Sequence, residues 1–524
     1  RQFSKAAVAT DVPECSEMGK SILLEGGTAV DAAITSMLCI GLVNGESSGI
    51  SGGFFMMMYD TKAKKAEFLD ARNTAPAATN VNMFNSKPHT MIYGALAIAT
   101  PGEVKGMWVA HQKYGKLPWK RLFAPVIELA RRGVELTIHG ATSIGDILQN
   151  YDNGTRPKEA GDIILRSEYA DTLQRIANNG WTEFYIGTTA DMIIEDMKTY
   201  NGILTKADLS NYDVRWSDGV KSSFMNYTVC SPGSPSGGLA YQFFLNVWKG
   251  YEIDLKTTAD KVRTFHRFLE TCKFASGQFS IMGDVDNPEV RQVMENLASE
   301  DFASNVRYTI KDDRLTYTNL SYYSSGIFDE TEKKGSTSHV SVLDENGNAV
   351  SVTTTINYYF GCKIMSTKSG IIYNNLMTSF TRPNSEKSYQ KKGFNYPGPN
   401  KRPKSGISGS IFLDKHGDVR FVVGSSGGNT IVPANAWATL LVLSSNYTLK
   451  KAVEWRRIFN PLFPNEGIYE EGFPKEVLSG LEKLGHVVTQ LPSYKFAVTQ
   501  AILKDDNGID AYSDSRKQGQ AAGY

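Results

Sequence analysis

A threonine that follows glycine and serine is the first residue in this sequence that could do chemistry. The segment K-K-G-S-T-S-H-V-S-V (333–342) places Thr337 at the start of an alternating, β-favouring run. A threonine hydroxyl is a weak nucleophile unless a base lies beside it, and its own α-amine can be that base. A free α-amine has an ordinary pKa of about 7.7–8.0 and is partly neutral at physiological pH. Because an internal threonine has no such amine, this chemistry requires a cut between Ser336 and Thr337.

The residues after Thr337 predict a β-hairpin that would hold the new terminus. Residues 339–357 alternate between apolar and polar types, with Asn346–Gly347 at the turn. If Glu345–Asn346–Gly347 forms a three-residue loop with Gly347 left-handed, Thr337 faces Thr355, and Asn357 lies on the same face. A two-residue loop would move Thr355 and Asn357 to the wrong face. We favour the first register, partly because it brings a hydroxyl and an amide to the nucleophile.

A glycine-rich turn farther along could supply the second part of a catalytic site. A strand pair is predicted at 408–424, and it ends in Ser425, Ser426, Gly427 and Gly428. Adjacent backbone amides can form an oxyanion hole. The residues alone leave simpler alternatives open, since Thr337 could open an ordinary surface hairpin and the glycines could form an ordinary turn.

The elements that must position these residues are helices packed on antiparallel strands. Gly26–Gly27 separates two apolar-periodic runs, and Gly133 provides a C-cap for a third. The predicted helices are 14–24, 28–43 and 117–133. A hairpin after the turn at 48–53 ends at Arg72, and the middle third is mainly helical. Helices followed by strands that are flanked by helices predict layers of helix on sheet.

Composition excludes several classes of function. The chain has 524 residues, 41% of them apolar, and a formal net charge of +1. This near-neutral balance argues against nucleic acid or an anionic membrane surface as a partner. The most apolar stretch, Ala29–Val43, contains Asp31, Thr35 and Ser36 and is better read as a buried helix than as a membrane span. Because the chain begins at Arg1, we expect that a targeting or anchor segment has been removed.

Cysteine and sequon patterns add weaker signals. The five cysteines show no C-x-x-C spacing and the seven histidines are scattered, which does not favour a zinc site, and the odd count leaves at least one thiol free. N-glycosylation sequons would suit a secreted glycoprotein, although chance alone would give a similar number. They begin at Asn153, Asn226, Asn319 and Asn446.

At this point the sequence resembles the γ-glutamyltransferase (γ-glutamyl transpeptidase) family along nearly its whole length. The ordered motifs that carry the resemblance are G-G-T-A-V-D-A-A-I (26–34), S-G-I-S-G-G-F-F (48–55), D-A-R-N-T-A-P (70–76), A-T-P-G-E-V-K-G (99–106), G-S-T-S-H-V-S-V (335–342), T-T-I-N-Y-Y-F-G (354–361), S-S-G-G (425–428) and S-D-S-R-K-Q-G-Q-A-A-G-Y (513–524). The resemblance implies an α/β (α+β) chain with the four-layer αββα sandwich of N-terminal nucleophile hydrolases. It also implies a precursor that splits into a large subunit, 1–336, and a small subunit, 337–524, which stay together as a heterodimer in one αββα domain.

The resemblance also implies roles for individual residues. Thr337 would attack the γ-amide of glutathione or a related γ-glutamyl donor, and Thr355 would support it. Gly427 and Gly428 would form the oxyanion hole, and Arg72 would bind the donor's α-carboxylate. Asn357 and Ser405 match further donor-binding positions. The acyl group would pass to water, an amino acid or a dipeptide, and no cofactor is implied. Cys15 and Cys39 match a disulfide pair of animal members, which fits an oxidising, extracellular compartment.

Departures from the family pattern remove or weaken three polar contacts to the donor. The family usually has N-N-E-M-D-D-F where this chain reads N-N-L-M-T-S-F (374–380), so Leu376 and Ser379 replace two carboxylates that hold the donor's α-ammonium. Gly406 replaces a second serine beside Ser405. A buried ammonium without a carboxylate partner is strongly disfavoured, so standard donors should bind weakly unless nearby acidic residues substitute. In the lysine-rich stretch 382–404, Glu386 is the one obvious candidate.

Two hypotheses therefore follow for a protein that is secreted or anchored by a removed N-terminal segment. In the first, it is an active γ-glutamyltransferase or glutathione hydrolase with reduced activity or altered specificity. In the second, it is a secreted transferase-like paralogue with little catalysis that acts as a binding or effector protein. Self-cleavage needs only Thr337 and its neighbours and could survive in either case.

Overall fold

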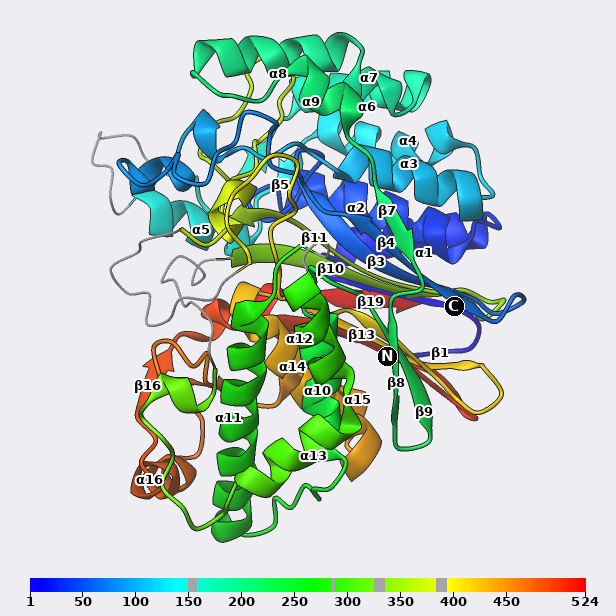
Figure 1. The fold of residues 1–524 in the computed structure, drawn as a ribbon. Coiled ribbons are helices and arrows are strands. Elements are labelled where there is room, and N and C mark those ends of the chain that lie inside the picture. The colour runs from blue at the N-terminus through cyan, green and yellow to red at the C-terminus, as the bar shows by residue number, and fades with distance from the viewer. Residues whose placement is uncertain (149–157, 285–287, 325–334, 383–393) are drawn as a thin grey trace.

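The computed structural model describes residues 1–148, 158–284, 288–324, 335–382 and 394–524. Two seven-stranded sheets lie face to face, and helices cover the outer face of each (Figure 1). This arrangement confirms the predicted α/β (α+β) class and its four αββα layers.

The strands of both sheets pair in an antiparallel manner. The first sheet contains, in spatial order, β19 (Gln520–Gly523), β2 (Ala7–Thr10), β10 (Gly335–Leu343), β11 (Ala349–Tyr358), β3 (Gly53–Asp60), β4 (Lys65–Ala71) and β7 (Arg215–Ser217). The second sheet contains β1 (Gln2–Phe3), β18 (Gly508–Ser513), β17 (Val498–Asp505), β13 (Val419–Ser426), β12 (Ser410–Leu413), β9 (Tyr227–Ser231) and β8 (Val220–Phe224). Hairpin pairs such as β10–β11 and β17–β18 alternate in both sheets with neighbours from distant parts of the chain, such as β2 beside β10 and β9 beside β12.

The N-terminal half supplies the helices over the first sheet, coloured from blue through cyan to green in Figure 1. They are α1 (Pro13–Leu24), α2 (Ala29–Val43), α3 (Glu103–Tyr114), α4 (Trp119–Arg132), α5 (Ile138–Leu148), α6 (Ser167–Asn179), α7 (Thr182–Tyr185), α8 (Thr188–Thr199) and α9 (Lys206–Asn211). The helices on the side of the second sheet are α10 (Gly238–Trp248), α11 (Thr258–Ile281), α12 (Pro288–Ala298), α13 (Glu300–Thr309), α14 (Ile431–Ser445), α15 (Leu449–Glu454) and α16 (Lys475–Lys483). Two small sheets complete the fold: β5 (Val134–Glu135) with β6 (Ile163–Ile164), and β14 (Ile458–Phe459), β15 (Gly467–Glu470) and β16 (Val488–Leu491).

The apolar core follows these layers. One cluster lies between the first sheet and its helices, a second between the other sheet and its helices, and a third between the two sheets. In β10, Val340 and Val342 belong to the first cluster, whereas Leu343 belongs to the cluster between the sheets. Because successive side chains of a strand point to opposite faces, one face of β10 packs against helices and the other against the second sheet. The predicted helices are confirmed, with α2 starting one residue later because Thr28 is its N-cap.

The predicted hairpin forms, with one irregularity at the nucleophile. The three-residue loop brings Leu343 opposite Ala349, and Gly347 is left-handed with φ of 83°. The predicted register continues to the pair Ser338 and Thr354, and then shifts before Ser336, which lies opposite Asn357. Thr337 therefore lies in a β-bulge and not in a regular pair with Thr355. Bulges of this kind re-aim a side chain, and they are common beside active sites.

Several smaller features complete the comparison with the sequence. A disulfide joins Cys15 in α1 to Cys39 in α2, with the Cα atoms 5.4 Å apart, and Cys230, Cys272 and Cys362 are free and buried. Of the four sequon asparagines, Asn153 lies outside the described residues, and the others are exposed at Asn226, Asn319 and Asn446. In the part of the chain that the structure describes, no helix could cross a bilayer, and no cluster of three or more acidic, histidine or cysteine residues could hold a metal ion.

Candidate active site

The hydroxyl of Thr337 lies against the glycine turn that follows β13. Gly427 N donates a hydrogen bond of 2.7 Å to Thr337 Oγ1. Gly427 has φ of 134° and Gly428 has φ of 62°, a region that favours glycine. A Cβ at Gly427 would also lie 2.6 Å from Ala497 Cα, so no larger residue fits. The turn thus presents its backbone amides where the alkoxide or oxyanion of an acyl transfer would develop.

Thr355 lies on the other side of the nucleophile, on the peptide bond that a self-cleavage would break. Its hydroxyl donates to the carbonyl oxygen of Ser336 and accepts from Asn357 N at 2.8 Å. A hydrogen bond to this carbonyl withdraws electrons from its carbon and favours attack on it. The spacing of the two threonines in the sequence predicted their proximity, although the bulge changes how they meet.

A buried lysine that the sequence did not single out also contacts the nucleophile residue. Lys517 Nζ donates to the carbonyl oxygen of Thr337 at 2.9 Å and pairs with Asp11 Oδ2 at the same distance. Ser336 Oγ in turn donates to Ser47 Oγ at 2.6 Å. These residues come from the two ends of the chain, and only the strand order β19-β2-β10 brings them to Thr337. No local spacing in the sequence could have revealed them.

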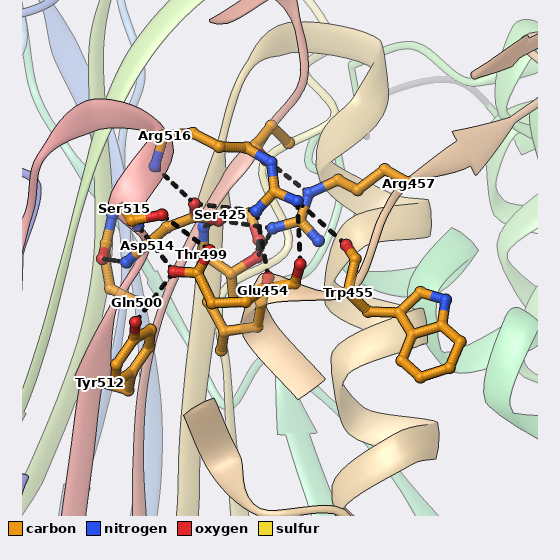
Figure 2. A network of polar contacts seen from close by, with 12 residues as sticks. Ser425, Glu454, Trp455, Arg457, Thr499, Gln500, Tyr512, Asp514, Ser515 and Arg516 are labelled. Carbon is orange, nitrogen blue, oxygen red and sulfur yellow. Dashed lines mark hydrogen bonds and ion pairs between the residues drawn. The ribbon is translucent and has the colours of Figure 1, made fainter. Parts of the chain in front are cut away.

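An ionic network behind the glycine turn fixes both Ser425 and the segment that carries Lys517 (Figure 2). Asp514 accepts from Arg457 and pairs with Arg516, and all three side chains are almost fully buried. Arg457 also donates to Thr499 Oγ1, which lies 2.7 Å from Ser425 Oγ. The strand end at Ser425 and the segment that carries Lys517 therefore depend on the same buried ion pairs.

A cavity of about 530 Å³ leads from Thr337 to Arg72. Arg72 follows β4 and is 1% exposed. Its Nε and Nη2 donate to the carbonyl oxygens of Pro403 and Lys404, each at 3.1 Å, and its Nη1 has no hydrogen-bond partner among the described residues. Burial lowers the pKa of the Arg72 guanidinium to about 9. A buried cation with a free N–H donor on a cavity wall is suited to bind an anion.

The segment 374–380 meets the cavity with Ser379 but not with Leu376. Ser379 lines the cavity, and its Oγ donates to Asn357 Oδ1 at 3.3 Å. Leu376 is fully buried in a small apolar cluster with Phe84, Met91 and other residues, and it is not one of the residues that line the cavity. The sequence reading had placed both positions at the donor. No Asp or Glu of the described ranges lines this cavity, and Glu386, the candidate substitute named from the sequence, lies outside the described residues.

The remaining candidates lie on the opposite wall. Ser405 and Gly406 both line the cavity, after a segment whose carbonyl groups hold Arg72. Lys404 lines it as well, although its neighbour Arg402 is instead paired with Asp70. One cavity is thus lined by most of the candidate site residues, namely Thr337, Thr355, Gly428, Arg72, Asn357, Ser379, Ser405 and Gly406. Gly427 reaches the site by its hydrogen bond to Thr337 Oγ1.

Comparisons with known proteins agree with this arrangement. A family model described as Gamma-glutamyltranspeptidase matches residues 15–524. Scoloptoxin SSD14 of Scolopendra dehaani is 36% identical over 541 residues, which covers 99% of this chain and 92% of the relative. Glutathione hydrolase 5 proenzyme of Mus musculus is 33% identical over 542 residues, which covers 100% of this chain and 93% of the relative.

Solved structures show the same architecture. A cephalosporin acylase from Bacillus halodurans superposes with a TM-score of 0.85 at 22% identity, covering 100% of this chain and 96% of that one; at this identity the likeness shows the fold alone. A Helicobacter pylori γ-glutamyltranspeptidase superposes with a TM-score of 0.54 at 30% identity, covering 59% of this chain and 92% of that one.

Proposed function

Because this chain belongs to the γ-glutamyltranspeptidase family, we propose that it is a γ-glutamyltransferase and hydrolase that cuts itself before Thr337 and then forms a γ-glutamyl-threonyl enzyme. The observation that carries the proposal is the 2.7 Å contact between Gly427 N and Thr337 Oγ1 in a cavity that also contains Arg72. A nucleophile, an amide donor for an oxyanion and an anion-binding group are thus gathered in one space.

Self-cleavage comes first in this scheme. Thr337 Oγ1 attacks the carbonyl carbon of Ser336, whose oxygen already accepts from Thr355. The peptide bond becomes an ester, which water then hydrolyses, leaving subunits 1–336 and 337–524 as a heterodimer. The freed α-amine of Thr337 becomes the general base for its own hydroxyl. The word proenzyme in the name of the mouse relative fits such processing.

Acyl transfer then uses the same hydroxyl. Arg72 binds the α-carboxylate of glutathione or a related donor, and Thr337 Oγ1 attacks the γ-amide carbon. The amides of Gly427 and Gly428 stabilise the oxyanion, and losing one such donor costs about 2.7–4 kcal/mol. The leaving amine takes a proton, and water, an amino acid or a dipeptide accepts the acyl group.

We expect weak turnover of standard donors. Leu376 and Ser379 give the cavity no carboxylate for an α-ammonium, and Gly406 gives it no hydroxyl. The same observation supports a second candidate, a secreted transferase-like paralogue that binds its ligand or a protein partner with little catalysis. The disulfide Cys15–Cys39 and the exposed sequons at Asn226, Asn319 and Asn446 support an extracellular location for either candidate.

Two measurements test the proposal. Intact mass of the purified protein should show two chains split at Ser336–Thr337, whereas Thr337→Ala should stay a single chain of 57.8 kDa. Release of 4-nitroaniline from γ-glutamyl-4-nitroanilide should be slow for the wild type and absent for Thr337→Ala. Rescue of this activity by Ser379→Asp, at a residue that lines the cavity, would show that the missing carboxylate limits binding of the standard donor. An uncut wild-type chain would rule the enzyme out, and a cut chain with no turnover of any γ-glutamyl donor would favour the paralogue.

A further inference from the structure

A second cavity adjoins the catalytic one. It is partly open to solvent, spans about 800 Å³ with that solvent included, and shares Phe279, Lys404, Gly406 and Asn429 with the cavity at Thr337. Its remaining wall is mostly apolar and comes from α10, α11, α14 and the segment after β14. The apolar residues of this wall include Phe244, Cys272, Ala275, Val432, Phe459 and Phe463. We call this space the apolar chamber. Because the two spaces share these lining residues, they adjoin near Gly406.

Gly406 lies at the junction of the two spaces. A Cβ at this position would lie 3.1 Å from the carbonyl oxygen of Gly428, which is tighter than almost all real contacts. Any side chain here would therefore narrow the passage between the glycine turn and the chamber. The glycine that removes a hydroxyl from the catalytic cavity also keeps this passage open.

The charges that line the two spaces select against an ammonium group. Arg72 Nη1 is buried without a hydrogen-bond partner in the described part of the chain, and Lys404 lines both cavities. No acidic residue of the described ranges lines either one. An ammonium held there would be desolvated beside two cations, which is strongly unfavourable. The ligand that fits is an anion with an apolar group and without a free amine.

We propose that the acyl donor is the γ-amide of an N-acylated glutamate, with its α-carboxylate on Arg72 and its apolar N-acyl chain in the chamber. N-acylation converts the ammonium into a neutral amide and supplies the apolar group. The chemistry is that of the proposed function, on which this inference rests. The bond from Thr337 Oγ1 to the carbonyl carbon of the γ-amide forms, the C–N bond of that amide breaks, and the amine leaves with a proton. Water then releases the N-acylglutamate and restores the hydroxyl.

Three γ-4-nitroanilides of glutamate, which share the same leaving group and differ only at the α-amine, test this proposal. They carry a free α-amine, an N-acetyl group and an N-hexanoyl group. Each buried methylene contributes about fourfold in affinity, so kcat/KM for the hexanoyl donor should exceed that for the acetyl donor by about tenfold or more. The free-amine donor should be the poorest of the three. A wild-type enzyme that prefers the free amine, or that treats acetyl and hexanoyl donors equally, overturns the inference and leaves the proposed function standing.

Substitutions in the chamber supply the matched comparison. Val432, on α14, lines the chamber but not the catalytic cavity. Val432→Phe fills the chamber and should reduce the hexanoyl-to-acetyl ratio to near one, whereas Val432→Ala should keep it high. Gly406→Ser should also lower the ratio, because it narrows the passage. A ratio unchanged by Val432→Phe, in a protein with wild-type circular dichroism, would show that the chain does not enter the chamber.

Binding of the products separates this inference from the proposed function. Calorimetry should show that N-hexanoylglutamate binds at least about tenfold more tightly than N-acetylglutamate, and that Val432→Phe removes the difference. If no anilide is hydrolysed but this difference persists, the chamber is confirmed and the catalytic proposal fails. If the two acids bind equally, the chamber proposal fails whatever the turnover.

Discussion

Among single residues, Lys517 has the strongest claim to a role that the sequence did not reveal. Its ammonium contacts the carbonyl oxygen of Thr337 and pairs with the buried carboxylate of Asp11. In the intact chain it holds the carbonyl group of Thr337 itself, one residue after the peptide bond that self-cleavage would break. After cleavage it would place a positive charge close to the new α-amine of Thr337, and a nearby like charge favours the neutral form that acts as a base.

Replacing Lys517 by methionine keeps the length of the side chain and removes the charge. We expect Lys517→Met to slow self-cleavage by about tenfold or more, since charge-assisted hydrogen bonds contribute about 1.5–3 kcal/mol. The fraction of cut chain against time, followed by intact mass, measures this. Lys450→Met, at an exposed lysine in α15, is the control. Cleavage of Lys517→Met at the control's rate would show that the contact has no part in processing.

Glu103 is a single residue that should make the free energy of unfolding depend on pH. It is 1% exposed and accepts a hydrogen bond from Thr354 Oγ1, and burial raises its pKa to about 8. The folded protein therefore holds a proton that the unfolded chain releases above a pH of about 4.3. Between these two values the unfolded state binds fewer protons, so the stability contributed at low pH is lost as the pH rises through 8.

Glu103→Gln removes this titration. Urea unfolding at pH 5, 7 and 8.5 should show the wild type losing a few kcal/mol as the pH rises, at about 1.36 kcal/mol per pKa unit. Glu103→Gln should lose distinctly less, and Glu128→Gln, at an exposed position of α4, should behave as the wild type. Parallel curves for Glu103→Gln and the wild type would contradict the assignment.

At the scale of elements, the arginine and aspartate network connects the glycine turn to the C-terminal segment (Figure 2). Asp514 is the carboxylate that Arg457 and Arg516 share. Removing this carboxylate takes away the buried ion pair of Arg457, whereas Arg516 keeps its pair with the buried Glu470. The turn at Gly427 and the position of Lys517 should therefore loosen together.

Asp514→Ala should lower the free energy of unfolding by about 3–5 kcal/mol, the usual cost of breaking a buried pair. Thermal denaturation of the Thr337→Ala background measures this without interference from self-cleavage. Asp171→Ala breaks the exposed pair with Arg131 and should cost less than about 1 kcal/mol. Similar losses for the two substitutions would mean that the network does not stabilise the fold.

The elements also show which parts of the site a sequence can predict. The hairpin loop at Gly347 and the helix α2 depend on neighbouring residues, so alternation and helical periodicity predicted them, although the helix was expected to begin one residue too early, at Thr28. The bulge at Thr337 depends on contacts with the glycine turn and with Lys517, which no neighbouring residue encodes. The burial of Leu376 depends on contacts with Phe84 and Met91, which are distant in sequence. The sequence could therefore show that leucine replaces a carboxylate of the family, but not that its side chain lies away from the cavity.

At the scale of the whole molecule, the cut proposed before Thr337 would divide strands that lie side by side. In the first sheet, β2 of the large piece lies between β19 and β10 of the small piece. In the second sheet, β1 pairs with β18, and β12 pairs with β9, again across the two pieces. The heterodimer therefore cannot separate without breaking both sheets.

This arrangement predicts different refolding before and after processing. Thr337→Ala, as one chain, should recover its circular dichroism after dilution from urea, because its refolding is unimolecular. The cut protein should recover less, and its yield should depend on concentration, since two chains must meet. Equal, concentration-independent recovery for both would argue against shared sheets in the processed form.

The order of the strands thus implies that the sheets form before the proposed cut. β2 pairs with β10 while both belong to one polypeptide, and the cut would then remove the covalent connection that favoured this pairing. If the proposed cut occurs, a processed molecule that unfolds can refold only after its two chains meet again. Its lifetime would then be set by the height of the unfolding barrier rather than by an equilibrium between folded and unfolded forms.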